Sequence, residues 1–455
     1  MSASASAWTA DANEALSLSL VRAPEDKASL WSREVYEGFH PTFTYPIFGE
    51  EEKVYGYKDL AIELKFASGS LAQYLNVQYS ERLPASSAVD EIEDTLAKFI
   101  PEGYYTDEKR FLERVEHDAA NFKPFGEKIY SYSRTAMPVS KGKNVAIPQV
   151  LSPEDQETVD YEVYHASIWA PIRRPGVAHF KSTWKTPGFR EFHRRMQLFV
   201  LLYIEGGSYI SEDEETWEFV VLYEKRRRRS SPDVATYHFV GYSTLFPFYC
   251  FPERVRLRIS QFLILPPYQQ DGHGSALYTA IYQHVLAQPR IAELTVEDPA
   301  EAFEDLRDRN DLKMLLANEK FMREGFGPEA VSSNGGKVGG VGNGRTRRGV
   351  KHRTMRAGAG KMGPPAERTW LEKWRTELKI AGRQFHRLIE MLILKHMDPA
   401  DERGNRAYRL QVKERLYRFN FEILMQLDKQ ERQQKLEETF QSVVADYKRI
   451  LGHVH

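Results

Sequence analysis

Apolar and polar residues alternate along several short stretches at the start of the chain, and this alternation predicts β-strands. Two later segments change to helical spacing. We therefore predict an N-terminal α/β domain over residues 10–137. The expected strands are Leu16–Val21, Val54–Tyr57, Ala61–Phe66 and Tyr74–Tyr79, and the expected helices lie within Asp90–Ile100 and Thr106–Phe122.

A second domain is expected over residues 138–325, opening with the Pro- and Ser-rich segment Pro138–Val159, which is typical of a linker. Phe189–Tyr203 has the pattern of a buried helix. Trp217–Tyr223 and Tyr237–Tyr242 predict a hairpin whose long basic loop is Lys225–Asp233.

The second half of this domain is predicted to alternate strands and helices. Arg258–Leu265 is expected to form a strand that ends at Pro266 and Pro267, because proline cannot donate to a ladder. A helix follows from about Gly274. Leu294–Glu297 is a further short strand, and a helix is expected from Pro299 to about Glu319.

The remainder of the chain divides by composition. Residues 326–368 are rich in Gly, Lys and Arg, and Ala330–Ala366 contains no acidic residue, so we expect a disordered basic linker. Residues 369–455 are expected to form a three-helix unit. Its helices are Trp370–His396, Asn405–Leu427 and Lys429–Leu451.

Composition narrows the class of protein. The chain has 455 residues, 42% of them hydrophobic, and a net charge of −1. That charge combines acidic clusters in the first half with basic runs at Lys225–Arg229 and Arg345–Arg356, which favours a charged macromolecular partner. Cys250 is the one cysteine, which excludes an intrachain disulfide. Without a signal-like or membrane-length apolar segment, we expect a soluble intracellular protein.

The loop between the strand at Arg258–Leu265 and the helix after it has the chemistry of an anion site. Gly272 and Gly274 let backbone N–H groups approach an anion without hindrance from a Cβ atom, and the helix start adds free donors and a positive dipole end. A Walker loop is excluded because Gly-Lys-Ser/Thr is missing, and a dinucleotide fingerprint is excluded because Leu277 replaces the third glycine.

Two adjacent carboxylates, Glu297 and Asp298, stand at the next junction between strand and helix. Asp298 before Pro299, with Glu301 three positions later, is typical of a helix N-cap, so structure alone explains Asp298. Glu297 has no such role and is the candidate general base. We assign Asp298 as cap with a supporting electrostatic role.

The loop and its flanking strand resemble the acyl-CoA motif of the GNAT superfamily of N-acetyltransferases. The resemblance implies an α+β fold, with a mixed sheet flanked by helices as the acetyltransferase core. It also implies that the backbone of Phe262, Leu263 and Ile264 contacts pantetheine and polarises the thioester. The implied pyrophosphate contacts are Gln269, Gln270, Asp271, Gly272, His273, Gly274 and Ser275.

Several further segments resemble, in order and spacing, the type B histone acetyltransferase catalytic subunit family. They include Asn13–Leu16, Phe48–Glu52, Gly56–Lys58, Phe122–Gly126, Ile259–Leu265, Val296–Pro299 and Leu306–Asp311. The resemblance implies acetyl-CoA as co-substrate, without a metal, and the N-terminal tail of newly made histone H-four as acceptor. It adds Arg309 as a coenzyme contact. The implied tail contacts are Glu50, Glu51, Glu52, Trp217, Phe246, Pro247 and Phe248.

The same resemblance implies a WD-repeat histone-binding partner and a location in cytoplasm and nucleus, with no direct contact with nucleic acid or membrane. Direct attack in a ternary complex is favoured over an acetylated Cys250, because a lone cysteine in an aromatic stretch is more often a packing residue. Two other functions stay open. They are an acyl-CoA transferase for a small amine and a histone-binding module without catalysis.

Overall fold

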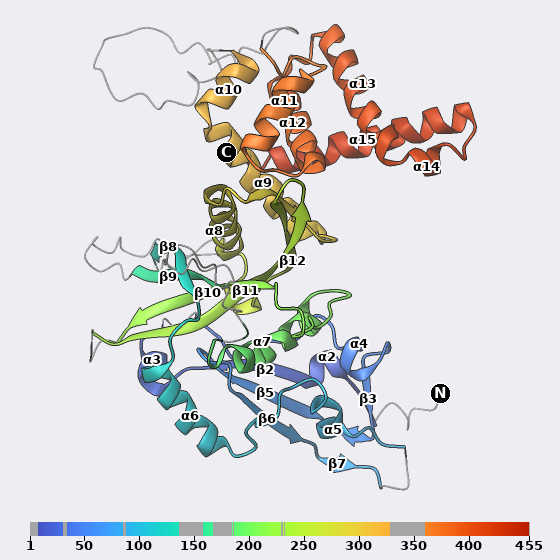
Figure 1. The fold of residues 1–455 in the computed structure, drawn as a ribbon. Helices are drawn as coiled ribbons and strands as arrows, with labels where there is room; N and C mark the ends of the chain where they lie inside the picture. The colour runs from blue at the N-terminus through green and yellow to red at the C-terminus, as the bar shows by residue number, and fades with distance from the viewer. Residues whose placement is uncertain are drawn as a thin grey trace, which may run out of the picture. The chain divides into compact units, whose positions relative to one another are not determined.

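The computed structural model describes residues 8–30, 34–84, 88–135, 158–166, 184, 186–228, 231, 233–327 and 360–454 (Figure 1). The chain divides into two compact units. Unit 1 comprises Met1–Phe248 and Arg258–His284, and unit 2 comprises Tyr249–Leu257 and Val285–His455. Most of the predicted Pro- and Ser-rich segment, and most of the predicted basic linker, lie outside the described residues. Among the described residues, no helix has the length and apolar character needed to span a membrane.

The N-terminal sheet of unit 1 has the order β2-β5-β6, formed by Leu16–Val21, Ala61–Ala67 and Gln73–Gln78. β2 and β5 are parallel, and β5 and β6 are antiparallel. Every second residue of β2 is buried, as the alternation predicted. Helix α6 (Glu108–Asn121) packs on this sheet through Phe111 and Val115.

Shorter elements surround this sheet. Two small strand pairs are β1 with β3 and β4 with β7. These strands are Thr9–Asp11, Lys53–Tyr55, Tyr57–Lys58 and Glu81–Arg82, and the short helices α2 to α5 are Ala12–Ala15, Pro24–Ala28, Tyr45–Phe48 and Ile92–Leu96.

A larger sheet carries most of the remaining strands of unit 1, and neighbours β8, β9, β10 and β11 pair antiparallel in sequence order. The basic hairpin is confirmed, but its strands are longer than predicted. Lys225, Arg226 and Arg227 belong to a strand because each pairs with a residue of the next strand. The strands β8 to β12 are Glu127–Thr135, Thr158–Ala166, Glu218–Arg227, Ala235–Cys250 and Arg254–Ile264.

Helix α7 (Phe189–Tyr203) lies between the two sheets of unit 1 (Figure 1). Phe199 contacts Phe66 of the N-terminal sheet and Phe239 of the larger sheet, with ring centroids 4.7 and 6.0 Å apart. A helix covered on both sides carries apolar residues over much of its surface, and this pattern predicted the helix from the sequence. The predicted and observed bounds are the same.

Strand β12 leads through the 3-10 turn η3 (Pro266–Tyr268) into helix α8 (His273–Ala287), as predicted. In unit 2, β13 (Ile291–Val296) pairs with the first residues of β12, where Val255 N–H donates to Arg290 O at 2.9 Å. Helices α9 (Glu301–Ala317) and α10 (Glu319–Phe326) follow.

The predicted three-helix unit is more divided than the sequence indicated. The expected helix Trp370–His396 is interrupted at Leu378–Ala381, where Lys379 has a φ of +53° and its carbonyl accepts a bond from Leu294 N–H of β13. A tertiary bond therefore breaks a continuous helical pattern. The observed helices α11 to α15 are Arg368–Glu377, Gly382–His396, Glu402–Phe419, Phe421–Leu424 and Lys429–Leu451.

Candidate active site

The loop before α8 and the first residues of that helix have the backbone geometry of an anion site. We call this segment, Gln269–Ser275, the cradle. Gln270 and Gly272 have φ angles of +65° and +76°, which turn the chain sharply into the helix. The first bond of α8 runs from Ala276 N–H to Gly272 O at 3.1 Å. The backbone N–H groups of His273 and Gly274 therefore precede the helical ladder at the positive end of the helix dipole. This arrangement suits a pyrophosphate.

Arg134 of β8 is a cation beside this cradle that the sequence did not reveal. Its guanidinium group lies directly against Gly272, in the space that a Cβ atom at position 272 would enter. Glycine is favoured at this position because its φ is positive. Arg134 belongs to no motif, and only the folded sheet brings it to the loop.

The side chain of His273 is buried beneath the cradle. Its Nδ1 lies 2.6 Å from the hydroxyl of Tyr132, and its ring lies 4.4 Å from that of Tyr161. Burial, with a smaller contribution from Arg134, lowers the pKa of His273 to about 4. At neutral pH this imidazole is uncharged, so the His273 side chain adds no positive charge to the cradle.

A buried polar network, formed by Arg22, Glu224, Arg226 and Tyr268, anchors the turn that precedes the cradle. The Tyr268 hydroxyl donates to Glu224 Oε2 at 3.0 Å, and Arg22 binds both oxygens of Glu224 at 3.0 and 2.8 Å. Arg226 binds the same carboxylate. Burial alone would raise the pKa of Glu224, but the two guanidinium groups hold that pKa well below its usual range. The network thus joins β10 and the residue that follows β2 to the turn.

Strand β12, which carries the predicted thioester contacts Phe262–Ile264, packs tightly against β11. The carbonyl of Leu263 and the backbone of Ile264 approach Gly241 so closely that a Cβ atom there would collide with them. Leu265 N–H still donates to Val240 O at 3.0 Å, so the hydrogen bonding between β12 and β11 continues as far as Pro266. Gln269 Nε2 donates to Ile264 O at 2.9 Å, which joins the end of the strand to the cradle.

Gln261 links β12 to the loop after α7. Its Nε2 donates to Ser208 O at 2.9 Å, while its Oε1 accepts from Thr244 Oγ1 at 3.3 Å. In the same loop, Gly206 N–H donates to the hydroxyl of Tyr45 in α4 at 2.7 Å. A continuous set of contacts therefore runs from β12 to α4 and to the acidic residues that follow α4.

The three predicted acidic contacts have different environments. Glu50 and Glu51 are exposed, and Glu51 lies 3.3 Å from Lys53. Glu52 accepts the backbone N–H groups of Thr44 and Tyr45 at 2.6 and 3.1 Å, and the Thr44 bond lowers the pKa of Glu52. Glu52 thus caps α4. Glu50 and Glu51 remain as the carboxylates that face solvent.

The predicted aromatic contacts form one continuous surface. The rings of Trp217 and Phe246 lie 4.9 Å apart, as do those of Phe246 and Phe248. Arg258 of β12 lies 4.3 Å from the centre of the Phe248 ring. The half-exposed Trp217 therefore adjoins Phe246 and Phe248 although the sequence separates them, and their place at the strand ends of β10 and β11 explains the proximity.

The two carboxylates after β13 belong to unit 2, and both are exposed. The prediction that Asp298 caps α9 is wrong. The N-cap is Ala300, which makes no side-chain cap bond, and the helix begins at Glu301. Asp298 has a φ of +31°, whereas an N-cap residue adopts an extended backbone. Glu297 is the first residue after the strand rather than its last.

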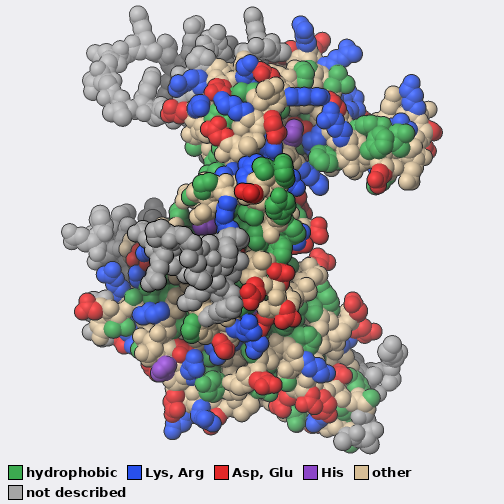
Figure 2. Space-filling model, viewed as in Figure 1, with side chains coloured by type: hydrophobic (Ala, Val, Ile, Leu, Met, Phe, Trp, Pro, Cys, Tyr) green, Lys and Arg blue, Asp and Glu red, His purple; other side chains and the backbone are tan. Residues whose placement is uncertain are grey.

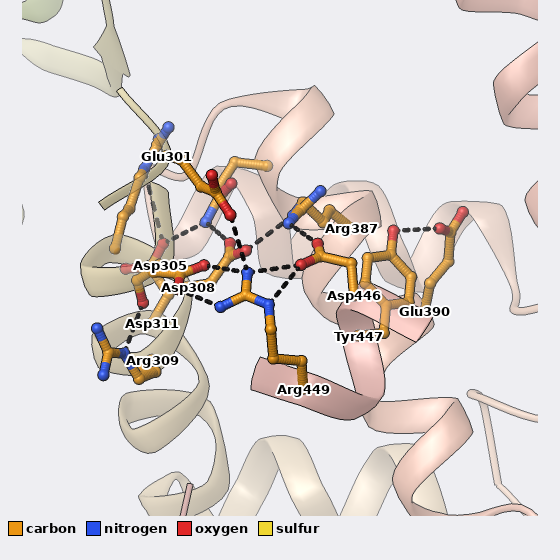
Figure 3. A network of polar contacts seen from close by, with 12 residues as sticks. Glu301, Asp305, Asp308, Arg309, Asp311, Arg387, Glu390, Asp446, Tyr447 and Arg449 are labelled. Carbon is orange, nitrogen blue, oxygen red and sulfur yellow. Dashed lines mark hydrogen bonds and ion pairs between the residues drawn. The ribbon is translucent and has the colours of Figure 1, made fainter. Parts of the chain in front are cut away.

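Arg309 is half-buried on α9, where its Nε donates to Asp305 O at 2.9 Å. Figure 3 shows the polar network that joins this helix to the C-terminal helices. Arg449 binds Asp305 at 2.7 Å, and Arg387 joins Asp308 and Asp446 at 2.8 and 2.7 Å. The C-terminal helices therefore brace α9 within unit 2.

The fold and the cradle together define the class of protein. The predicted α+β fold is confirmed: a mixed sheet is flanked by helices, and one strand leads through a glycine-bearing turn to the start of α8. This is the arrangement of a GNAT-like acetyltransferase.

Comparison with known proteins identifies the family. A family model described as the N-terminus of the histone acetyl transferase HAT1 matches residues 8–205, and one described as the C-terminal part of fungal HAT1 matches residues 358–398. A protein of Cryptococcus neoformans var. neoformans serotype D is 48% identical, over 98% of this chain and 97% of its own length. A protein of Mycosarcoma maydis is 40% identical, over 98% of this chain and 88% of its own length. A protein of Candida albicans is 33% identical, over 98% of this chain and 90% of its own length.

All three relatives are named histone acetyltransferase type B catalytic subunit. The chain belongs to this family, whose members are acetyl-CoA-dependent acyltransferases.

Proposed function

We propose that this chain transfers the acetyl group of acetyl-CoA to tail lysines of newly synthesised histone H-four, by direct attack of the lysine on the thioester. The contacts of β12 carry the proposal. The strand is joined to the cradle through Gln269. It is also joined, through Gln261 and the loop after α7, to α4 and to the acidic turn that follows α4, Glu50–Glu52. One strand of unit 1 thus connects the anion site with the carboxylates suited to a basic peptide.

The cofactor's phosphates are assigned to the first turn of α8 and to Arg134. Two backbone donors, a helix dipole and a guanidinium group match the charge of a pyrophosphate. The backbone of Phe262, Leu263 and Ile264 is assigned to the pantetheine arm, and a main-chain N–H in this strand would polarise the thioester carbonyl. Arg309 is assigned a supporting coenzyme contact.

Glu297 is the proposed general base. A lysine has a pKa near 10.4, so its neutral form costs roughly 4–5 kcal/mol at pH 7. A carboxylate that accepts the proton, directly or through water, lets the nitrogen attack. Glu297 is exposed and has no capping role in α9. Asp298, which is also free of a capping role, is assigned an electrostatic contribution beside it.

The histone tail is assigned to the acidic turn and the aromatic surface. Glu50 and Glu51 suit the positive charges of the tail, and Trp217, Phe246, Pro247 and Phe248 suit the aliphatic stems of its lysines. Figure 2 shows Asp and Glu side chains interspersed with Lys and Arg on the face of unit 1 that it displays. A WD-repeat histone-binding partner and a location in cytoplasm and nucleus complete the proposal.

A small-amine acyltransferase and a non-catalytic histone-binding module are distinguished by one experiment. The full-length chain is incubated with acetyl-CoA and either an H-four tail peptide or the polyamine spermidine, and products are identified by mass spectrometry. We expect acetyl-lysine on the peptide, and less of it with Gly272→Ala, because a side chain strains the backbone at the positive φ of this residue. Acetylated spermidine with an unmodified peptide, or no product with either acceptor, would contradict the proposal.

A further inference from the structure

Three side chains with metal-ligand chemistry meet inside unit 1, away from the cradle residues. They are His165 of β9, Glu218 of β10 and His284 of α8. One ligand atom from each lies within 4.8 Å of the others. His165 Nε2 lies 2.8 Å from Glu218 Oε2, and the rings of His165 and His284 have centroids 4.2 Å apart. Three separate elements therefore point imidazole and carboxylate groups at one place.

We propose that His165, Glu218 and His284 bind a zinc ion that fastens α8 to the sheet. Two imidazoles and one carboxylate form a ligand set typical of zinc, with a fourth position left for water. Zinc bonds of 2.0–2.1 Å place tetrahedral ligand atoms about 3.3 Å apart, so small side-chain adjustments would bring these three groups into range.

Burial favours a cation here over a simple ion pair. The side chain of Glu218 is 0% exposed and that of His165 is 8% exposed, so the carboxylate has left water. A hydrogen bond from His165 alone involves only one of the two imidazoles that lie beside this carboxylate. A divalent cation instead binds both imidazoles in their neutral form together with the carboxylate.

The consequence concerns the helix that begins at the cradle. His284 lies near the end of α8, whose first residue, His273, belongs to the cradle. Zinc would hold the far end of this helix against β9 and β10. The site is separate from the proposed acetyl transfer, and its test does not depend on activity.

The test uses the full-length chain with any purification tag removed. Each protein is incubated with zinc, dialysed against zinc-free buffer and analysed for metal content. We expect about one zinc ion per wild-type chain, no retention by His284→Ala or Glu218→Gln, and full retention by His453→Ala, which removes an exposed histidine. Zinc should also raise the thermal midpoint of the wild type and of His453→Ala, but not of the other two variants.

Wild-type protein that retains no zinc, or variants that all retain equal amounts, would overturn the proposal. If a variant does not fold, cobalt decides the question in the wild type alone. The proposal predicts the intense visible absorption of tetrahedral cobalt, and the weak spectrum of aqueous cobalt would contradict it.

Discussion

The ion pair of Arg22 with Glu224 and that of Arg449 with Asp305 brace different elements and differ mainly in their exposure to water. In unit 1, the ion pair between Arg22 and Glu224 has side chains only 2% and 0% exposed, and it supports the turn before the cradle. In unit 2, Arg449 and Asp305 are 41% and 20% exposed, and they brace α9 (Figure 3). Similar charge pairs should therefore contribute very unequally to stability.

The reason is the solvent around each pair. Breaking a buried pair leaves a charge without a partner in a medium of low polarity, whereas water and salt screen an exposed pair and replace its bonds. Glu224 would be left without its strongest partner if Arg22 were lost. Asp305 would remain close to solvent without Arg449.

Arg22→Ala should have the largest effect on stability. We expect a loss of about 3 kcal/mol in the free energy of unfolding, because the buried carboxylate of Glu224 then keeps only Arg226 and Tyr268 as partners. Urea unfolding followed by circular dichroism measures it. Arg194→Ala is the control, since Arg194 belongs to an exposed pair with Glu212. A loss no greater than that of the control would remove the distinction between the networks.

Acid should weaken unit 1 through its buried neutral histidines. The pKa of His273 is about 4 in the folded protein and near 6.5 when unfolded, so the unfolded state binds a proton first as the pH falls. The stability contribution is therefore full above pH 6.5 and is lost between 6.5 and 4. From pH 7 to 5 we expect a loss of roughly 2 kcal/mol from this residue.

Unfolding of wild type and His273→Asn at the two pH values isolates this contribution. The asparagine retains a polar group near Tyr132 but does not titrate. The variant should lose less stability between pH 7 and pH 5 than the wild type. Equal losses would show that the imidazole is already protonated, or accessible to protons, in the folded state.

Arg449→Ala should have the smallest effect. The bonds to Asp305 and Asp446 are partly exposed, so we expect a much smaller loss of stability than for Arg22→Ala, reduced further by added salt. The same urea unfolding measures it at low and high salt. A salt-independent loss as large as that of Arg22→Ala would mean that the unit 2 network is as well shielded as that of unit 1.

The sequence predicted those parts of the fold that depend on local pattern. Helix α7 and strand β2 have the expected bounds because their apolar residues recur with the correct period. The break at Leu378–Ala381 could not be read in this way, because a bond from Leu294 to Lys379 produces it. Tertiary contacts override local pattern at such positions.

The candidate site shows the same limit. The cradle was visible from the spacing of Gly272 and Gly274 before a helix. Arg134 was not, because only the folding of β8 beside the cradle brings it there. The predicted cap at Asp298 failed because the chain continues past Pro299 to Ala300 before α9 starts. The sequence does not show that Glu52 caps the N-terminus of α4, because Glu52 follows that helix and a capping residue normally precedes it.

The most direct test of the proposed chemistry is Glu297→Gln, assayed on the H-four tail peptide at saturating substrates and for acetyl-CoA binding by calorimetry. The amide retains the shape of the side chain but cannot accept the lysine proton. We predict that kcat falls about 10²- to 10⁴-fold while acetyl-CoA affinity stays nearly unchanged. An unchanged kcat would contradict the assignment of Glu297 as general base.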